Sequence, residues 1–437
     1  MLKSIVPLSA IISLRFFGLF IVLPVISVYA MQLHGATTTL VGIVVGGYAL
    51  TQMIFQIPFG IMSDKLGRKG TIVLGLILFG LGSLLCSVSN DILTLMLGRF
   101  MQGAGAIGAV VTAMISDLVK EEQRPKAMAM MGGSIAMAFA VSMILGPTIG
   151  AYLGVEVLFV LVAVIAFGSI VVLLKMVPNP PHITHTYAKK GNITSVLTNA
   201  NLIKMNITNF LQKGLMTFAF MIIPMVLINN FEWVMADLWK VYLPATIFGV
   251  LAMAPAAIIA EKKGKFKEIL IVGIVFFTIS YLLIGVSESA TMFVIGVVVF
   301  FIGFNMHEPI MQSLATKYAK VYQRGFVLGI FNSFGYFGTF LGGLLGGLFF
   351  EKVSLFEIVV AIAVVCVLWI VLIFTLPNPL KKKTLYLSLD EYKREKTSAL
   401  EECQGLDEWY FNESENLLII KYDEDIINED SLTNLLK

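Results

Sequence analysis

Ionisable side chains inside long apolar stretches are the residues of this chain that could do chemistry. Arg15, Arg99 and Lys213 are cations, and Glu308, preceded by His307, is an acid at similar depth. A charge inside a membrane-spanning helix is costly, so each position suggests a function. A carboxylate that exchanges protons as a cavity changes sides would couple transport to a proton gradient. Glu308 is the first candidate for that role and His307 the second, because adjacent helical residues point about 100° apart and only one faces a cavity squarely.

Structural alternatives stand beside these assignments. Glu308 could be locked in an ion pair with Lys213 or Arg15, and Arg99 could hold a structural ion pair or a backbone contact. Arg15 and Lys213 lie at nearly matching depths in the two halves of the chain. A cavity wall that contained both residues would be basic. It would favour an anionic group or require a carboxylate partner.

Uncharged polar residues in the apolar stretches are candidates for the wall of a central cavity. Amide side chains do not face lipid without a partner, and aromatic rings suit an adaptable apolar pocket, although packing is the alternative reading for any single ring. The predicted cavity residues are Gln52, Gln56, Tyr48, Asn209, Lys213 and Asn305.

The loop after the second apolar stretch reads Gly60-Ile-Met-Ser-Asp64-Lys65-Leu66-Gly67-Arg68-Lys69. Its glycines permit a tight turn. Asp64 could face the N-terminus of a helix in the other half, where the helix dipole favours an anion by roughly 0.3 to 1 kcal/mol. The alternative is that the basic residues only anchor the topology.

The composition of the chain indicates which kind of secondary structure positions these residues. The chain has 437 residues, of which 57% are hydrophobic and 14% charged, and its mean hydropathy is +0.87. These values do not fit a soluble protein. Windows of roughly 20 apolar residues, enough to cross about 30 Å of hydrocarbon, recur from residue 5 to about 375. They predict twelve transmembrane helices, including continuous ones at about 5–31 and 91–119.

Basic residues mark one side of the predicted bundle. Lys and Arg gather in the loops after helices 2, 4, 6, 8 and 10, whereas the alternate loops hold only Lys240 and Lys352. Basic loops stay in the cytoplasm, so both termini are predicted to be cytoplasmic. Three cysteines far apart in sequence indicate neither a disulfide framework nor a metal site.

The chain divides into two similar halves and a tail. We place a six-helix bundle at 1–177, a proline-containing linker at 178–202, a second bundle at 203–376 and a tail at 384–437. An offset of 197 aligns Asp64 with Glu261 and Gly67 with Gly264. Two such halves would enclose a cavity near the bilayer midplane and rock between states open to either side.

The tail is acidic where the rest is basic. It holds 5 of the 31 Lys and Arg residues and 14 of the 28 Asp and Glu residues, so its net charge is −9 against +12 for the remainder. Strands near 384–387, 408–411 and 417–422 and helices near 390–403 and 429–436 predict a small ferredoxin-like α+β domain. This domain could contact the basic loops, and a passive solubilising tail is the alternative.

The loop at 60–69 resembles the signature loop of the major facilitator superfamily, and the resemblance extends over essentially the whole chain. It implies an all-α membrane fold of two pseudo-symmetric bundles. It also implies a gating role for the loop, and we assign to the gate Gly60, Asp64, Lys65, Gly67, Arg68, Lys69 and, at the end of the fourth helix, Asp117.

Two further motifs resemble those of drug:proton antiporters in this superfamily. Arg99-Phe-Met-Gln-Gly-Ala-Gly resembles a fourth-helix pattern that is linked to proton coupling, which adds Arg99 and Arg15 to the proton-coupling candidates. Gly146-Pro147-Thr-Ile-Gly150-Ala151 resembles the fifth-helix antiporter motif, with Ala151 where a second glycine is usual. Helix packing alone is the alternative for the fifth-helix motif.

These observations predict a secondary active transporter of a bacterial inner membrane. The expected cargo is a small amphipathic or toxic compound exported against protons, with lipid as the surrounding partner, no cofactor beyond the proton gradient, no metal and no nucleic acid. A proton-linked importer or facilitator is one alternative, and a membrane sensor that retains the fold is another. The sequence lacks a Gly-x-x-x-x-Gly-Lys-Ser/Thr loop, which argues against primary active transport.

Overall fold

The structure is a computed structural model that describes residues 2–119, 123–179, 196–319, 323–377, 382–388, 400, 403–412, 416–423 and 426–436. Within these residues twelve helical segments are long and apolar enough to cross a membrane, which confirms the predicted number. The helices are α1 (Leu2–Phe20), α2 (Leu23–Met31), α3 (Thr38–Leu66), α4 (Arg68–Ser87), α5 (Ile92–Ala104), α6 (Gly108–Leu118), α7 (Arg124–Leu153), α8 (Val155–Met176), α10 (Ala200–Phe231), η2 (Met235–Asp237), α11 (Trp239–Lys263), α12 (Phe266–Gly285), α13 (Ala290–Tyr318), α14 (Arg324–Phe349) and α15 (Leu355–Phe374).

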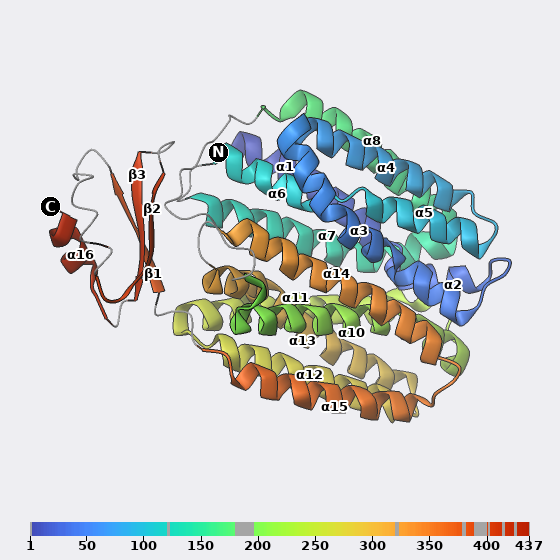
Figure 1. Ribbon diagram of the computed structural model, residues 1–437. Helices are drawn as coiled ribbons and strands as arrows, with labels where there is room; N and C mark the ends of the chain where they lie inside the picture. The colour runs from blue at the N-terminus through green and yellow to red at the C-terminus, as the bar shows by residue number, and fades with distance from the viewer. Residues whose placement is uncertain are drawn as a thin grey trace.

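The helices form two groups that lie side by side in Figure 1, with α1 to α8 above and α10 to α15 below. The N-terminus and the strands of the tail lie at one end, which we call the tail side, and the opposite end is the far side. The groups meet where α14 packs along α3, α11 along α7 and α10 against α2. Any site between the two halves therefore lies among these helices.

Two predicted helices are interrupted. The first span bends between α1 and α2, where Pro24 lies in the first turn of α2. The fourth span breaks at 105–107, so that α5 ends at Ala104 and α6 starts anew at Gly108. Apolar composition does not reveal such a break, because Gly105-Ala106-Ile107 is as apolar as the helix on either side.

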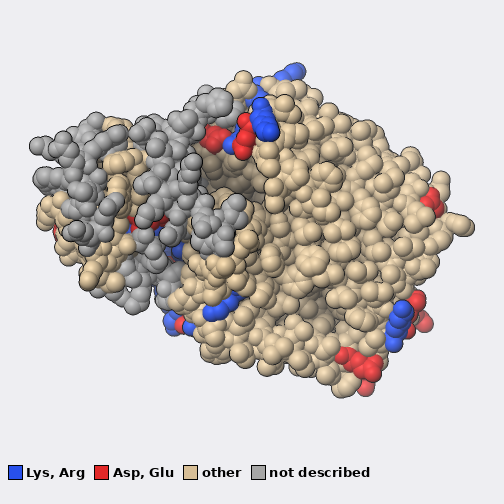
Figure 2. Space-filling model, viewed as in Figure 1, with Lys and Arg blue, Asp and Glu red and all other residues tan. Residues whose placement is uncertain are grey.

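The surface between the two ends is apolar. Large side chains such as Val164, Leu251 and Leu368 are about two-thirds exposed there. In Figure 2 the Lys, Arg, Asp and Glu side chains gather towards the two ends and leave the middle of this face without charge. Lipid contact accounts for such a belt, because a soluble protein rarely exposes so continuous an apolar surface.

The two halves touch closely on the far side. A Cβ on Gly42 of α3 would lie 2.3 Å from the carbonyl oxygen of Gly343 in α14, so the two backbones are in direct contact. Thr38 also donates a hydrogen bond to Glu351 at 3.4 Å at this end. Small residues allow this approach, and the far side is closed.

The tail side is more open. The space next to Gly60 on α3, to Gly132 on α7 and to Gly325 on α14 is empty within 4 Å of a Cβ built there. Figure 2 shows the surface hollowed on this side, next to the charged side chains near the tail. The two helix groups are therefore in close contact on the far side and apart towards the tail.

The tail forms a three-stranded antiparallel sheet in the order β1-β3-β2, from β1 (Lys382–Ser388), β2 (Leu406–Asn412) and β3 (Leu417–Asp423), with α16 (Glu429–Leu436). β1 and β2 run in the same direction on either side of β3, as in a split βαβ unit. The helix predicted at 390–403 falls largely outside the described residues, so the ferredoxin-like assignment stays a prediction.

One buried lysine of the sheet reaches the membrane bundle. Lys421 of β3 is 5% exposed, and its Nζ donates to the carbonyl oxygens of Ala319 at 3.0 Å and Lys317 at 3.4 Å. These carbonyls end α13, where the helix dipole is negative and favours a cation. The tail sheet is thus in contact with the second half of the bundle.

Candidate transport site

An ion pair joins α10 and α13, two helices of the second half, on the tail side of the closed contact. Lys213 Nζ of α10 is 2.5 Å from Glu308 Oε1 of α13, and Gln212 Nε2 donates to the same oxygen at 3.0 Å. The two charged side chains are 26% and 30% exposed. They are accessible charges, and of the partners that the sequence left open for Glu308, the structure pairs it with Lys213.

Aromatic rings from both halves close the space above this pair, towards the far side. Phe139 of α7 contacts Phe20 of α1, and across the interface it contacts Phe220, Phe301 and Phe304, with ring centroids 5.1 to 6.4 Å apart. Lys213 Nζ lies 5.0 Å from the Phe304 ring, close enough for a cation–π contact. This aromatic cluster separates the ion pair from the far side.

Arg15 lies in the first half with few partners. It is 1% exposed, and Nη2 donates to Gln52 Oε1 at 3.4 Å. The guanidinium lies 5.4 Å from the Phe79 ring and 5.7 Å from that of Phe16, while Nε and Nη1 have no hydrogen-bond partner among the described residues. Gln56, one turn beyond Gln52, bridges the halves by donating to the carbonyl of Gly329 at 3.1 Å.

Arg99 is held inside the first half. Its Nη1 donates to Gln102 at 2.7 Å, its Nε to the carbonyl of Val44 at 3.2 Å, and its guanidinium lies over the Tyr48 ring at 4.6 Å. Gln102 in turn donates to Ser83. Arg99 is fully buried, so in this conformation it can act on a cavity only through Tyr48.

His307 points away from Glu308. The ring is buried against Phe277 and Trp369, and Nε2 lies 2.8 Å from the carbonyl oxygen of Leu270 in α12. This is the outer side of α13. The geometry therefore favours Glu308 over His307 as the proton carrier.

The two predicted cavity asparagines are used in packing. Asn209 donates to the carbonyl of Phe331 at 2.7 Å and joins α10 to α14. Asn305 donates to Phe301 within its own helix, and its amide fills the space beside Gly249 of α11. Both are nearly fully buried, so neither faces an open cavity in this conformation.

The fifth-helix motif packs on the bend of the first span. A Cβ on Gly146 would lie 2.1 Å from the carbonyl oxygen of Ile21, between α1 and α2. Pro147 lies inside α7, and Gly150 has ordinary contacts with Val155 and Leu158. Gly146 is therefore required by close packing, which leaves any antiporter role of the motif a prediction.

The signature loop forms a charge network on the tail side. Arg68 donates to Asp64 at 2.6 Å, to Ser63 at 2.6 Å and to Asp117 at 3.0 Å. Gly67 joins α3 to α4 at φ +87° and ψ 153°, a conformation open to glycine alone. Asp64 is 68% exposed and pairs with its own loop, so the contact expected with a helix of the other half is not formed in this conformation.

The remaining members of the gating set take other places. Lys65 is exposed and Lys69 is partly exposed, and Gly60 faces empty space. The equivalent loop of the second half uses a different arrangement: Glu261 accepts hydrogen bonds from Ser313 and Lys317 at the end of α13. The two halves thus share a loop-to-helix ion pair with the charges exchanged.

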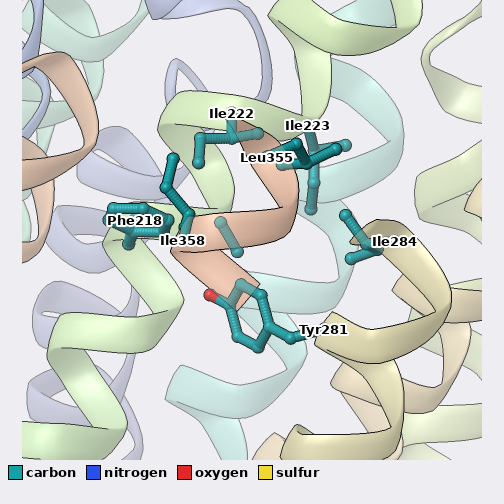
Figure 3. Close-up of a pocket in the computed structure, with 8 residues that line it drawn as sticks. Phe218, Ile222, Ile223, Tyr281, Ile284, Leu355 and Ile358 are labelled. Atoms are coloured by element: carbon teal, nitrogen blue, oxygen red, sulfur yellow. The ribbon is translucent and has the colours of Figure 1, made fainter. Parts of the chain in front are cut away.

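Two other recesses do not look like transport sites. Figure 3 shows the first, which is lined by apolar side chains such as Phe218, Ile222 and Ile358 and whose volume of about 10 Å³ would admit one water at most. The second, of about 220 Å³, lies on the tail side between Phe266, Lys267, Tyr318 and Pro377. Neither contains Glu308, Lys213 or Arg15.

Two packed groups of membrane-spanning helices with an ion pair inside one of them are the arrangement of a membrane transporter. The model of the Major Facilitator Superfamily matches residues 8–343 and 239–394. The chain belongs to this superfamily, a family of transporters and not of enzymes.

The chain is also similar to individual proteins of known name. The chain is 33% identical over 430 residues to "Inner membrane transport protein YajR" of Escherichia coli K12, covering 96% of this chain and 94% of the relative. It is 28% identical over 362 residues to "Quinolone resistance protein NorA" of Staphylococcus aureus COL, covering 80% and 90%. Among solved structures, a D-xylose–proton symporter superposes with a TM-score of 0.69 at 13% identity, covering 86% of this chain and 98% of that one.

Sequence reasoning missed several residues of the site. Gln212 could not be selected from the sequence, because a single amide next to a lysine gives no periodic signal. The partner of Glu308 could not be predicted either, because it depends on how α10 and α13 are rotated. Phe139, Phe220 and Phe301 were not selected because the chain has 32 phenylalanines. Only the repeat could have given a signal, because the three rings lie in the fifth, seventh and tenth membrane spans, which are α7, α10 and α13.

Proposed function

We propose that this protein is a proton-coupled exporter of a small amphipathic compound, that it works by alternating access, and that its tail side is cytoplasmic. The single observation behind the proposal is the accessible Lys213–Glu308 pair between an open and a closed end of the bundle. The basic loops on the tail side support the orientation. The name of NorA, a quinolone resistance protein, supports export of amphipathic compounds.

The pair supplies a mechanism for coupling. An ammonium at 2.5 Å attracts a carboxylate strongly and a neutral acid weakly. In the state open to the tail side, Lys213 and Gln212 hold the deprotonated form of Glu308. Rocking of the halves would part the aromatic cluster, expose Glu308 to the far side and allow it to bind a proton there. Return of the protonated state to the tail side would release the proton as the ion pair forms again.

Proteoliposomes provide the test. We expect wild-type protein to move amphipathic fluorescent cations or neutral compounds when a pH gradient is imposed. Glu308→Gln should lose gradient-driven flux but keep gradient-independent exchange of the same compound, because the amide cannot carry the proton. Glu429→Gln, an exposed acid on α16, is the control.

Two other outcomes of this experiment would each contradict one part of the proposal. Flux that ignores both the gradient and Glu308→Gln would make the protein a facilitator with a structural Glu308. Loss of both flux and exchange in a folded Glu308→Gln variant would move the residue from coupling to substrate binding.

A further inference from the structure

The first half holds buried positive charge that no acid neutralises. None of the ion pairs among the described residues includes Arg15 or Arg99. The described acidic residues of this half, Asp64, Asp91, Asp117 and Glu156, all lie at or next to helix ends. Arg99 is held by a carbonyl, an amide and a ring and leaves only Nη2 without a partner, whereas Arg15 has one long hydrogen bond and leaves both Nε and Nη1 without a partner.

An unpaired buried charge costs several kcal/mol, and an arginine does not shed its proton to avoid that cost. Glu308, the acid of the other half at this depth, is bound to Lys213 and Gln212. The protein therefore keeps Arg15 charged and short of partners, which is expected of a group whose partner is a ligand.

The break in the fourth span and Arg15 both pack against Phe79 of α4. Gly105 packs on α4, where a Cβ on it would lie 3.3 Å from the backbone nitrogen of Phe79, and the Phe79 ring lies beneath the Arg15 guanidinium. Tyr336 of α14 lies close to both features: its hydroxyl lies near Gln52, the hydrogen-bond partner of Arg15, and a Cβ on Gly108 would lie 3.9 Å from the same hydroxyl.

The new helix start supplies further donors. The first N–H groups of α6, at Gly108, Ala109 and Val110, have no intrahelical partner, and Ile107 provides no side-chain cap. Within the described backbone they form no other main-chain hydrogen bond. Gly108 and Ala109 are partly exposed. Interrupted helices of transporters direct such N-termini, with their positive dipole ends, at anionic groups of the substrate.

We propose that Arg15, Gln52, Tyr336 and the N-terminus of α6 form a subsite for an anionic group, a carboxylate, of the transported compound. The inference rests on the proposed transport function and adds the substrate class: an amphipathic acid or zwitterion. The ring of the compound would lie against the aromatic cluster, and its carboxylate would take the place of the Tyr336 hydroxyl beside Arg15.

Equilibrium binding to the full-length protein in lipid nanodiscs tests the subsite with two probes of the same shape, naphthoate and naphthamide. Wild type should prefer the carboxylate by about tenfold or more, the contribution of one charge-assisted hydrogen bond. Arg15→Gln should abolish the preference, and Arg15→Lys should retain part of it. Lys240→Gln, an exposed far-side lysine that pairs with Asp237, should not change it.

Gly108 allows a sharper test that leaves Arg15 in place. Because a side chain there meets only the Tyr336 hydroxyl within 4 Å, Gly108→Asp can place a carboxylate of the protein in the subsite. We expect Gly108→Asp to lose naphthoate binding and to raise the melting temperature, and this gain should vanish in the Arg15→Gln background. Gly108→Asn is the isosteric neutral control and should keep naphthoate binding.

Equal affinity of the wild type for the two probes, or unchanged naphthoate binding in Gly108→Asp, would overturn the subsite. Loss of the preference whenever chloride is present would assign the position to an inorganic anion and overturn the substrate class. The outcome is separable from the coupling mechanism: proton-driven flux of cations without carboxylate preference leaves the transport proposal standing, whereas carboxylate binding without proton-driven flux leaves the subsite standing.

Discussion

At the scale of single residues, the site holds three membrane-embedded cations and one carboxylate in unlike environments. Arg99 and Arg15 are almost completely buried, whereas Lys213 and Glu308 keep a quarter to a third of their side-chain surface accessible. In this conformation only Lys213 and Glu308 of these four residues are open to water, whereas Arg15 is covered by its neighbours. The depth of these residues could be predicted from the sequence, but their accessibility depends on how the helices are rotated.

Removing Lys213 should destabilise the protein more than removing the whole pair. Lys213→Gln leaves the Glu308 carboxylate without its cation; a fully buried pair broken in this way costs 3 to 5 kcal/mol, and partial exposure reduces this to about 1 to 3 kcal/mol. The double variant Lys213→Gln/Glu308→Gln should recover most of the melting temperature in detergent. A double variant less stable than Lys213→Gln would mean that the two charges do not depend on each other.

Gly67 gives a second prediction at this scale. Its φ of +87° and ψ of 153° exclude other residues, so Gly67→Ala should cost about 1 to 3 kcal/mol and loosen Arg68 from Asp117. Gly70→Ala is a matched control three residues away, because both positions have open space around a Cβ but Gly70 has no positive φ. Thermal unfolding of the two variants checks the prediction, and equal melting temperatures would remove backbone strain as the reason for Gly67.

At the scale of helices, glycines decide where the halves meet. Gly42 of α3 faces Gly343 and Gly347 of α14, and backbone atoms of these glycines lie 2.3 to 3.1 Å from Cβ atoms built on the opposite glycine. On the tail side, the glycines of α7 and α14 at 132, 133 and 325 face open space. The same residue type thus closes one end and leaves the other end free.

A large side chain at the closed end should hold that end open. Gly343→Leu cannot fit against Gly42, so we expect the equilibrium to shift to the state open on the far side and transport to fall. Deuterium uptake should rise at the far-side ends of α3 and α14, residues 38–46 and 339–347. Gly325→Leu places the same side chain in open space on the same helix and should have little effect; equal effects of both variants would argue against steric control of closure.

The helices themselves were predictable, and their irregularities were not. Windows of apolar residues are the dominant signal in a membrane protein, because lipid forces each span to satisfy its own backbone, and the twelve spans follow from it. The break at 105–107 has no such signal, since its residues are apolar and glycine also occurs in regular membrane helices. Phe139 was not foreseen because packing partners across the two halves are far apart in sequence.

At the scale of the whole molecule, the acidic tail contacts the basic bundle through Lys421. Lys421 is a cation in a domain of net charge −9, so overall charge does not explain its position. Its burial against the last carbonyls of α13 does. The end of α13 also carries Lys317, which pairs with Glu261 of the second signature-like loop. The tail therefore touches the part of the second half that corresponds to the signature loop of the first.

Lys421→Met should release the tail from the bundle without unfolding the tail itself, because methionine keeps the length of the side chain but cannot donate to the α13 carbonyls. Cys403 provides the measurement: it is partly exposed in the tail, whereas Cys86 and Cys366 are fully buried, so a maleimide dye labels the tail selectively. Fluorescence anisotropy of the dye should fall in Lys421→Met, as the domain gains rotational freedom, and should stay unchanged in Glu429→Gln. An unchanged anisotropy in Lys421→Met would show that the tail is held by other contacts. If anisotropy falls and proton-driven flux changes with it, the contact links the tail to the movement of α13, the helix that carries Glu308.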